Sequence, residues 1–401
     1  MLRRLMLVTA GESHGPGLTV ILTGMPAGLA VDFGLIASDL ARRQHGYGRG
    51  RRMQIERDAA EVRGGVRNGE TLGSPIALWI ENRDWKSWQT ILHPQTTDPH
   101  MSEKRRIRSP RPGHVDLASS IKYDRRDPRD VLERASARET TGRVAAAAFA
   151  KMLLREVGVE MRSGVRSLGP IGADLPTPSW EELQQVDETS PLRAIHRELE
   201  ADMVALVDRA QEEGETLGGA VTVIAHGVPL GLGSHVAWDD KLDGRLAQAV
   251  MSVPAVKAVE IGGALAAARG FGSEAHDAIG FDPEAETVGT RWPRPTNRAG
   301  GSEGGVTNGA DVVVTAYKKP ISTLRKGMPS VDLDTLEPHA STYERSDVTA
   351  LPAAGVIAES MVALVLADAL LEKLGGDSMA ELLDHWRATS ERQMVWPPRE
   401  E

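Results

Sequence analysis

The chain has 401 residues, of which 41% are hydrophobic and 26% are charged, and its formal net charge is −9. This is the composition of an ordinary globular protein, and the negative charge weakens the case for nucleic-acid binding. The sequence contains no cysteine, which excludes disulfides, thiol catalysis, iron–sulfur clusters and cysteine-bound zinc. The lack of cysteine also fits a reducing cytoplasm, where we expect the protein to be located.

The N-terminal apolar run leads directly into a glycine-rich loop, without a cleavage site made of small residues, so we expect no signal peptide. Residues 3–10 are predicted to form a strand and residues 19–23 a second strand. The loop between them has the sequence Gly-Glu-Ser-His-Gly and covers residues 11–15.

This loop begins a repeated segment. Residues 11–29 align without a gap with residues 214–232, with 10 identical positions in 19, and a shorter echo begins at Gly69. The glycines of such a loop allow sharp turns, and its Glu and Ser or Thr can bind loop amides. We expect a single domain over residues 1–401, with related halves at about 1–160 and 201–376 and a peripheral insertion at 165–200.

His14 distinguishes the first copy, because both other copies have leucine at this position. A lone histidine is by default a satisfied core or surface side chain. Since the loop is repeated elsewhere without histidine, the sequence favours a chemical role for His14.

Residues 32–43 have helical spacing and lead into a basic, glycine-rich loop that ends near Arg49. Arginine, histidine, tyrosine and glycine amides in this loop suit a phosphate group. Residues 53–57, 61–64 and 76–80 alternate as antiparallel strands do.

Arginines are dense over residues 42–57 and 104–143, which favours a small polyanion as ligand. A solvated charged face and nucleic-acid binding are the alternatives for these clusters.

Residues 85–100 are predicted to be irregular. After them, two prolines and a glycine restrict the backbone just before His114, which stands two residues from Asp116. A rigidly held histidine beside an aspartate suits acid–base chemistry. The alternative is a proline-rich surface turn.

Ser136, with Glu139 three residues later, predicts a capping box and a helix start that can bind an anion. An alanine-rich helix follows over residues 140–157. A second alanine-rich helix is predicted over residues 353–374, and we expect the two to pair at the centre of the molecule. The second one contains Glu359 and Asp368, so we expect no membrane span.

The second half is predicted to contain helices over residues 201–213 and 241–251 and strands over residues 257–261 and 312–316. Residues 297–309 hold five glycines. Such density can mean a flexible linker, but the Asn, Arg and Thr between the glycines favour backbone wrapped around a ligand. The segment that follows the last strand, Lys-Lys-Pro-Ile-Ser-Thr, combines ammonium and hydroxyl groups that suit a phosphate.

Seven motifs resemble those of the chorismate synthase family, in the family's order and over almost the whole chain. Small departures occur at Val115 and Thr349, where the family more often has alanine and cysteine. The motifs are GESHG at 11–15, RPGHVD at 111–116, RASARET at 134–140, PAVKAVEIG at 254–262, NRAGGSEGG at 297–305, KKPIST at 318–323 and RSDVTALPAAGV at 345–356.

The resemblance implies an α+β fold, a β-α-β sandwich with long central alanine-rich helices and an internal pseudo-twofold repeat, assembled as a homotetramer. It implies a lyase that converts 5-enolpyruvylshikimate 3-phosphate to chorismate and phosphate by 1,4-anti elimination. It also implies the cofactor reduced FMN, although the reaction is redox-neutral. An acidic protein that binds a substrate with a phosphate and two carboxylates needs a local basic pocket.

By the same resemblance, His14 lies at the phosphate, His114 protonates the reduced flavin and Asp347 assists proton removal at the flavin. Arg43 and Arg49 would bind substrate anions or, in members that reduce their own flavin, NADP. The residues implied for FMN are Arg134, Ala135, Ser136, Pro254, Ala255, Gly304, Lys319, Pro320, Ile321, Ser322, Thr323 and Arg345.

Two other functions are weighed against this one. An NADPH-dependent flavin reductase or flavin-binding protein would bind flavin without needing His14. A nucleic-acid-binding module would use the arginine clusters and show steep salt dependence. We expect no metal, no nucleic acid and no membrane partner, and reduced FMN supplied by an external flavin reductase or reductant. Whether the chain reduces its own flavin stays open.

Overall fold

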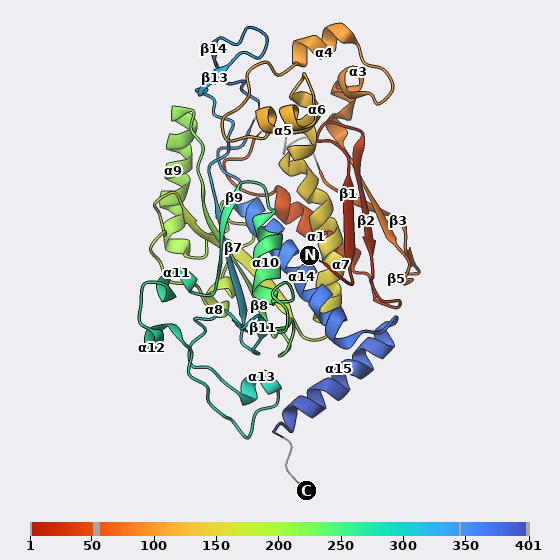
Figure 1. Cartoon of the computed structure of the whole chain (residues 1–401), viewed down its shortest axis with the longest axis vertical. Helices are drawn as coiled ribbons and strands as arrows, with labels where there is room; N and C mark the ends of the chain where they lie inside the picture. The colour runs from red at the N-terminus through yellow and green to blue at the C-terminus, as the bar shows by residue number, and fades with distance from the viewer. Residues whose placement is uncertain (1, 51–56, 345, 398–401) are drawn as a thin grey trace.

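The structure is a computed structural model that describes residues 2–50, 57–344 and 346–397. Two four-stranded antiparallel sheets enclose a layer of long helices (Figure 1). The mixed α and β class expected from the sequence is therefore confirmed. The predicted strand at 53–57 and the site residue Arg345 lie outside the described residues, apart from residue 57.

The first sheet has the strand order β1-β2-β6-β3. Alternate side chains of its central strands are buried, among them Val20 and Leu78, because one face of the sheet packs against helix and the other does not. The strands are β1 Met6–Ala10, β2 Gly17–Thr23, β3 Ala60–Gly64 and β6 Ile76–Glu81.

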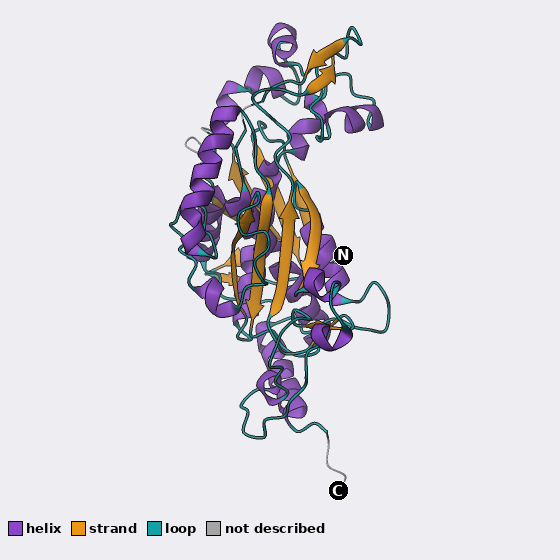
Figure 2. Cartoon of the chain, turned by 90° about the vertical axis from the view of Figure 1, so that its left-hand side faces the viewer, coloured by secondary structure: helices purple, strands orange, loops and turns teal. Residues whose placement is uncertain are grey.

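The second sheet has the order β7-β8-β12-β9 and lies face-on in Figure 2. In both sheets the first strand pairs with the second, the second with the fourth and the fourth with the third. The strands are β7 Glu160–Leu168, β8 Gly219–His226, β9 Val256–Ile261 and β12 Val312–Lys318.

The helices between the sheets are α7 Thr140–Arg155 and α14 Leu351–Leu374, flanked by α1 Phe33–Gln44 and α10 Leu242–Met251. Helix α7 packs on the first sheet, α14 packs on the second, and the two helices pack on each other. Residues 145–148, all alanine, are fully buried, and their small side chains permit this close approach. The predicted pairing of the two alanine-rich helices is confirmed.

Helix α14 is long and apolar enough to cross a membrane by length and composition, but 94% of its most apolar window is buried inside the fold. Burial of this kind is typical of the core helix of a globular protein. Its carboxylates are paired. Asp368 accepts the backbone N–H groups of Arg3, Arg4 and Leu5, while Glu359 belongs to a buried charged cluster.

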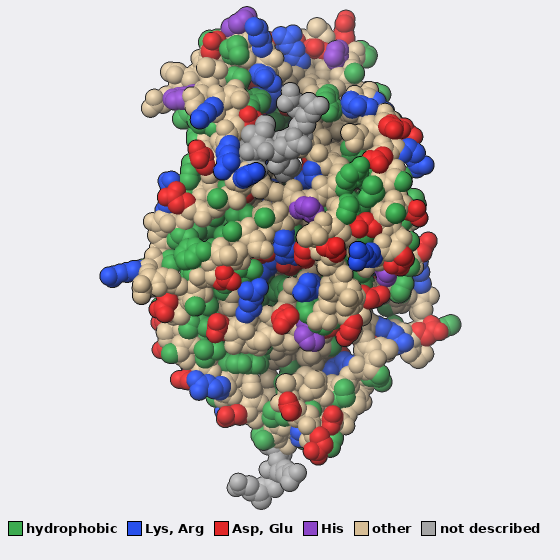
Figure 3. Space-filling view, turned by 180° about the vertical axis from the view of Figure 1, so that it is seen from behind, with side chains coloured by type: hydrophobic (Ala, Val, Ile, Leu, Met, Phe, Trp, Pro, Cys, Tyr) green, Lys and Arg blue, Asp and Glu red, His purple; other side chains and the backbone are tan. Residues whose placement is uncertain are grey.

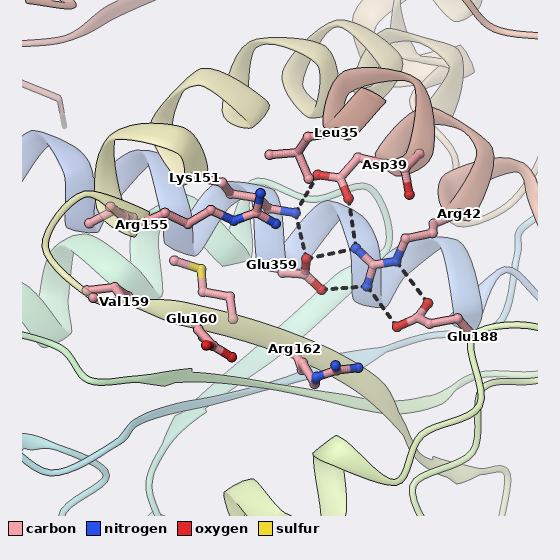
Figure 4. A pocket seen from close by; sticks show the side chains of 14 residues that line it. Leu35, Asp39, Arg42, Lys151, Arg155, Val159, Glu160, Arg162, Glu188 and Glu359 are labelled. Carbon is pink, nitrogen blue, oxygen red and sulfur yellow. Dashed lines mark hydrogen bonds and ion pairs between the residues drawn. The ribbon is translucent and has the colours of Figure 1, made fainter. Parts of the chain in front are cut away.

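That cluster borders a cavity of about 570 Å³ between α1, α7, α14 and β7 (Figure 4). Lys151 Nζ lies 2.6 Å from both Asp39 and Glu359. Arg42 lies 2.9 Å from Glu359 and 2.9 Å from Glu188. A third cation, Arg193, lies 2.8 Å from Glu188, so three cations balance three carboxylates. The cluster therefore joins the helices rather than presenting a net charge to the cavity.

The expectation of a peripheral insertion at residues 165–200 is wrong. The segment begins inside β7, and Val165 pairs with Ala194. Leu168 and Leu192 belong to the main core, and Arg193 is fully buried, donating to Ser163 O at 2.8 Å. The proline and glutamate content that suggested a surface segment belongs to its middle, residues 170–191.

The remaining elements lie around this core, and residues 85–100, expected to be irregular, contain short helices. The helical ones are η1 Arg83–Ser87, α3 Gln89–Leu92, α4 Pro99–Arg105, α5 Asp116–Lys122, α6 Arg129–Ala135, η2 Ala137–Glu139, α8 Trp180–Gln184, η3 Arg197–Leu199, α9 Glu200–Glu213, α11 Ala264–Ala267, α12 Gly272–Ala275, α13 Val288–Arg291 and α15 Met379–Met394. The short strands are β4 Val66–Arg67, β5 Glu70–Thr71, β10 Ser302–Glu303, β11 Val306–Thr307, β13 Pro329–Val331 and β14 Pro338–Ala340.

Candidate active site

His14 lies in the loop that follows β1, and the backbone of this loop is fixed by a glycine turn and by hydrogen bonds. Gly11 has φ +108°, and a Cβ there would lie 2.3 Å from Gly17 O, so this turn requires glycine. The side-chain amide of Asn82 donates to Gly15 O at 2.8 Å and to Glu12 O at 3.1 Å. The buried side chain of Asn82, which follows β6, therefore holds the loop on both sides of His14.

The His14 imidazole is bound to a buried carboxylate. Its Nδ1 lies 2.8 Å from Glu133 Oε2, and its backbone N–H donates to the same oxygen at 3.0 Å. The ring stacks on Trp88 with 4.1 Å between centroids. Burial alone would raise the pKa of Glu133, but the hydrogen bond from His14 and the charge of Arg129 hold it below its ordinary value.

His114 forms a second pair of this kind. Its Nδ1 lies 2.5 Å from Oδ1 of Asp116, which is fully buried. Arg111 binds the same carboxylate through Nε at 2.8 Å and Nη2 at 2.9 Å. Burial would raise the pKa of Asp116, but these hydrogen bonds from His114 and Arg111 hold it well below its usual range. Arg111 Nη2 also lies 3.1 Å from His114 Nδ1, so the carboxylate and the guanidinium together orient the ring.

The segment after β12 packs against the His114 loop. Lys319 Nζ donates to Gly113 O at 3.0 Å and to Ser322 Oγ at 2.8 Å, and Thr323 accepts a hydrogen bond from Arg111 at 2.9 Å. The backbone N–H of Lys319 donates to the carbonyl of Ala255 at 2.9 Å, which also brings in the neighbouring Pro254. Seven implied cofactor residues are therefore grouped here, namely Pro254, Ala255, Lys319, Pro320, Ile321, Ser322 and Thr323.

Arg43, Arg49 and Asp347 form a third group. Asp347 Oδ2 lies 3.2 Å from Arg49 Nη1, and its Oδ1 accepts the N–H of Gly50 at 2.6 Å. Arg43 is buried and donates to Ala137 O at 2.7 Å and Thr140 Oγ1 at 3.0 Å. Burial lowers the pKa of Arg43 to about 9, and the charges of Arg49 and Arg138 add to this effect.

The third group contacts the other two. Asp58 lies 3.5 Å from Arg43 and also binds Arg138, which donates to Asn82 Oδ1 at 2.8 Å below the His14 loop. Lys318, at the end of β12, precedes the His114-binding segment. Burial lowers the pKa of Lys318 to about 8, with Asp347 opposing the shift and Lys319 and Arg49 adding to it.

Arg134, Ala135 and Ser136 connect α6 to α7 beside the His14 loop. Arg134 donates to Thr9 O at 2.7 Å and to Gly11 O at 3.2 Å. Ser136 caps the short helix η2 by accepting the N–H of Arg138 at 3.3 Å. The predicted capping box is wrong in its second half, because Glu139 instead binds Thr9 and Arg143.

Gly304 is the implied cofactor residue that the chain does not bring to this end. It lies in the β10–β11 hairpin, and the next residue, Gly305, accepts the N–H of Leu242 at 2.9 Å. This hairpin precedes β12, whereas Lys319 follows it. Since β12 has seven residues, about 20 Å of strand separates the two ends.

Comparison with known proteins identifies the family. A family model described as chorismate synthase matches residues 5–371. The chain belongs to the chorismate synthase family. Curated chorismate synthases of Acidobacterium capsulatum and Geobacter sulfurreducens are 53% and 52% identical, covering 93% and 94% of this chain and 95% and 96% of their own. A solved structure titled "Crystal Structure of Chorismate Synthase" is 40% identical with a TM-score of 0.77, covering 99% of this chain and 100% of its own.

Membership of the chorismate synthase family makes the chain an enzyme, a lyase of aromatic biosynthesis that forms chorismate.

The hydrogen-bond donors at this end of the molecule fit an anionic ligand. The buried Nη1 of Arg43 makes no hydrogen bond within the described residues, and Asp58 Oδ2 lies 3.5 Å from it. Gly113 and Ala255 adopt positive φ angles of +75° and +68°, a conformation that turns the backbone sharply at the Lys319 segment. Within the described ranges, no group of three metal-ligating side chains could hold a metal ion.

Sequence reasoning about this chorismate synthase family member missed Glu133, Trp88, Asp58 and Asn82. Glu133 stands next to a recognised motif, but nothing in its spacing links it to His14, from which 119 residues separate it. Trp88 lies in the stretch predicted to be irregular. Asp116, in contrast, was indicated by its place two residues after His114.

Proposed function

We propose that the chain converts 5-enolpyruvylshikimate 3-phosphate to chorismate and phosphate by a 1,4-anti elimination that requires reduced FMN. The observation that carries the proposal is that two histidine–carboxylate pairs and a group of buried or half-buried cations lie at one end of a chain of this family. The substrate carries a phosphate and two carboxylates, which such cations can bind.

Arg43, Arg49 and Lys318 are the groups we assign to substrate anions. Arg43 is fixed by Thr140 and Ala137, and its Nη1 faces Asp58 Oδ2 at 3.5 Å, so the guanidinium is held in place before the substrate arrives. Preorganised donors of this kind stabilise charge without reorganisation during the reaction. Positioning the phosphate against these cations makes it a better leaving group.

We assign the two histidines to proton management. His14, next to Glu133, holds a proton for the departing phosphate. His114, next to Asp116, holds a proton at Nε2 toward the cofactor. Asp347, anchored by Arg49 and Gly50, is the carboxylate that accepts a proton at the cofactor side.

The residues that would hold FMN are the Arg134–Ser136 connection, the Lys319–Thr323 segment and Ala255. When bound, reduced FMN supplies electron density as the C–O bond to phosphate breaks and takes it back as the ring hydrogen leaves. The chain's part is to fix the Lys319 segment against the His114 loop through the hydrogen bonds to Gly113 O.

We also propose a homotetramer of the cytoplasm and a pseudo-twofold relation between the two halves. The identical pairing order of the two sheets supports the latter. On the face shown in Figure 3, acidic and basic side chains are interspersed, which favours a small-molecule site over a nucleic-acid surface.

The test is an anaerobic assay with purified protein, FMN, a chemical reductant and 5-enolpyruvylshikimate 3-phosphate, in which chorismate is followed by absorbance. We expect product only when the flavin is reduced. Flavin binding without product would instead support a flavin reductase. Replacing the chemical reductant by NADPH decides whether the chain reduces its own flavin or needs an external reductase.

A further inference from the structure

We propose that Glu133 is the positioning residue of His14, fixing the imidazole with its Nδ1 proton on the carboxylate and Nε2 as the nitrogen that exchanges a proton. The inference rests on the proposed role of His14, and it assigns to Glu133 a function that the sequence motifs do not indicate.

Three contacts fix the imidazole relative to Glu133. Nδ1 lies 2.8 Å from Oε2 and 3.1 Å from Oε1, and the backbone N–H of His14 donates to Oε2 at 3.0 Å. The stacked Trp88 ring covers one face of the imidazole. Backbone, ring edge and ring face are therefore all held, which leaves the ring little freedom to rotate.

Glu133 is itself held from the opposite side. Arg129 Nη1 donates to its Oε1 at 3.0 Å, and the side chains of Glu133 and Arg129 are only 2% and 4% exposed. Arg129 is anchored in turn by Arg105 O at 2.7 Å and Glu344 at 2.8 Å. A carboxylate fixed at both ends orients its histidine more strictly than a solvent-exposed one.

The charged groups facing the pair have opposite effects. Glu133 stabilises a protonated imidazole, whereas Arg129 keeps the carboxylate ionised. Arg129 and Arg105 lie 5.1 and 5.0 Å from the centre of the Trp88 ring on which His14 stacks. Glu344 lies beyond Arg129 and partly offsets its charge. The carboxylate in direct contact therefore dominates at His14.

The direct test is the ¹⁵N NMR spectrum of histidine-labelled full-length protein, with the His14 signals assigned by their loss in His14→Asn. We expect the neutral imidazole of the native protein to carry its proton on Nδ1. In Glu133→Gln we expect this tautomer preference to be lost. Unchanged His14 signals in Glu133→Gln would overturn the proposal, whether or not the protein turns over substrate.

The kinetic test compares kcat and KM. We expect Glu133→Gln to lower kcat by about 10–10²-fold, less than complete loss of an acid–base group, with KM and FMN binding nearly unchanged. Glu133→Asp should restore part of the rate. Native kcat in Glu133→Gln would contradict the proposal.

Glu344→Gln is the matched control, since it removes the other carboxylate on Arg129 without touching His14, and we expect native kcat and native His14 signals. An equal loss of kcat in this control would overturn the assignment to Glu133. If Glu133→Gln fails to fold because Arg129 is left unpaired, the double variant Glu133→Gln/Arg129→Gln removes both charges and is tested in the same way. A native protein inactive with reduced FMN would refute the proposed function, while the NMR result would still decide this inference.

Discussion

His14 and His114 each place Nδ1 on a buried carboxylate that also binds an arginine, but the two pairs are assembled differently. His114 and Asp116 are two residues apart in one loop, and Arg111 of the same loop completes the group. His14 instead meets Glu133 of α6, 119 residues away. A local pair needs only its own turn to form, whereas the second pair depends on the packing of β1, β6 and α6.

The difference extends to what surrounds each ring. Trp88 stacks on His14, but among the described residues no aromatic ring stacks on His114. His114 is also somewhat more exposed, at 23% against 16% for His14. The same histidine–carboxylate pair can therefore be held by a rigid loop or by tertiary packing, and variants at each pair should separate the two.

The largest expected effect comes from removing the rings themselves. We expect His14→Ala and His114→Ala each to lower kcat by about 10²–10⁴-fold, the scale for loss of an acid–base group, while FMN still binds. Steady-state kinetics in the anaerobic assay, with flavin titration as the control, measures this. Native turnover in both variants would refute the assigned roles.

Next in size is the loss of the local carboxylate. Asp116→Asn leaves Arg111 buried without its counter-charge, so we expect the free energy of unfolding to fall by about 3–5 kcal/mol. Denaturant unfolding followed by circular dichroism measures it. The exposed pair Arg387–Asp384 supplies a control, because Asp384→Asn should change stability by less than about 1 kcal/mol. A loss at Asp116 no larger than this would show that the loop does not depend on its ion pair.

The sequence predicted the local features of the molecule well. The loop around His14, the His114–Asp116 turn and the two alanine-rich helices all depend on neighbouring residues or on helical spacing. It could not predict which carboxylate meets His14, because that contact requires the first sheet and α6 to be placed first. It misplaced residues 165–200 because a polar middle hid the strand β7 at one end and the buried Arg193 at the other.

The two pairs should also respond to acid. Both carboxylates have pKa values below their unfolded values of about 4. Each therefore contributes stability that is present above pH of about 4 and is lost as pH falls through the folded pKa. We expect the stability difference between native protein and Asp116→Asn or Glu133→Gln to shrink as pH falls from about 5. Unfolding curves at several pH values measure this, and a difference independent of pH would contradict the linkage.

The smallest expected effect concerns Trp88, the aromatic ring that stacks on His14. Trp88→Phe keeps an aromatic face but removes the hydrogen bond from Nε1 to Asp84 at 3.2 Å and weakens the contacts with Arg105 and Arg129. Such cation–π contacts contribute about 0.5–1 kcal/mol each, so we expect kcat to fall by less than about tenfold, the factor for 1.36 kcal/mol. Trp88→Leu removes the aromatic face and should cost more. Equal kcat values in the two variants would mean that the face of the ring does not position His14 and that Glu133 alone orients it.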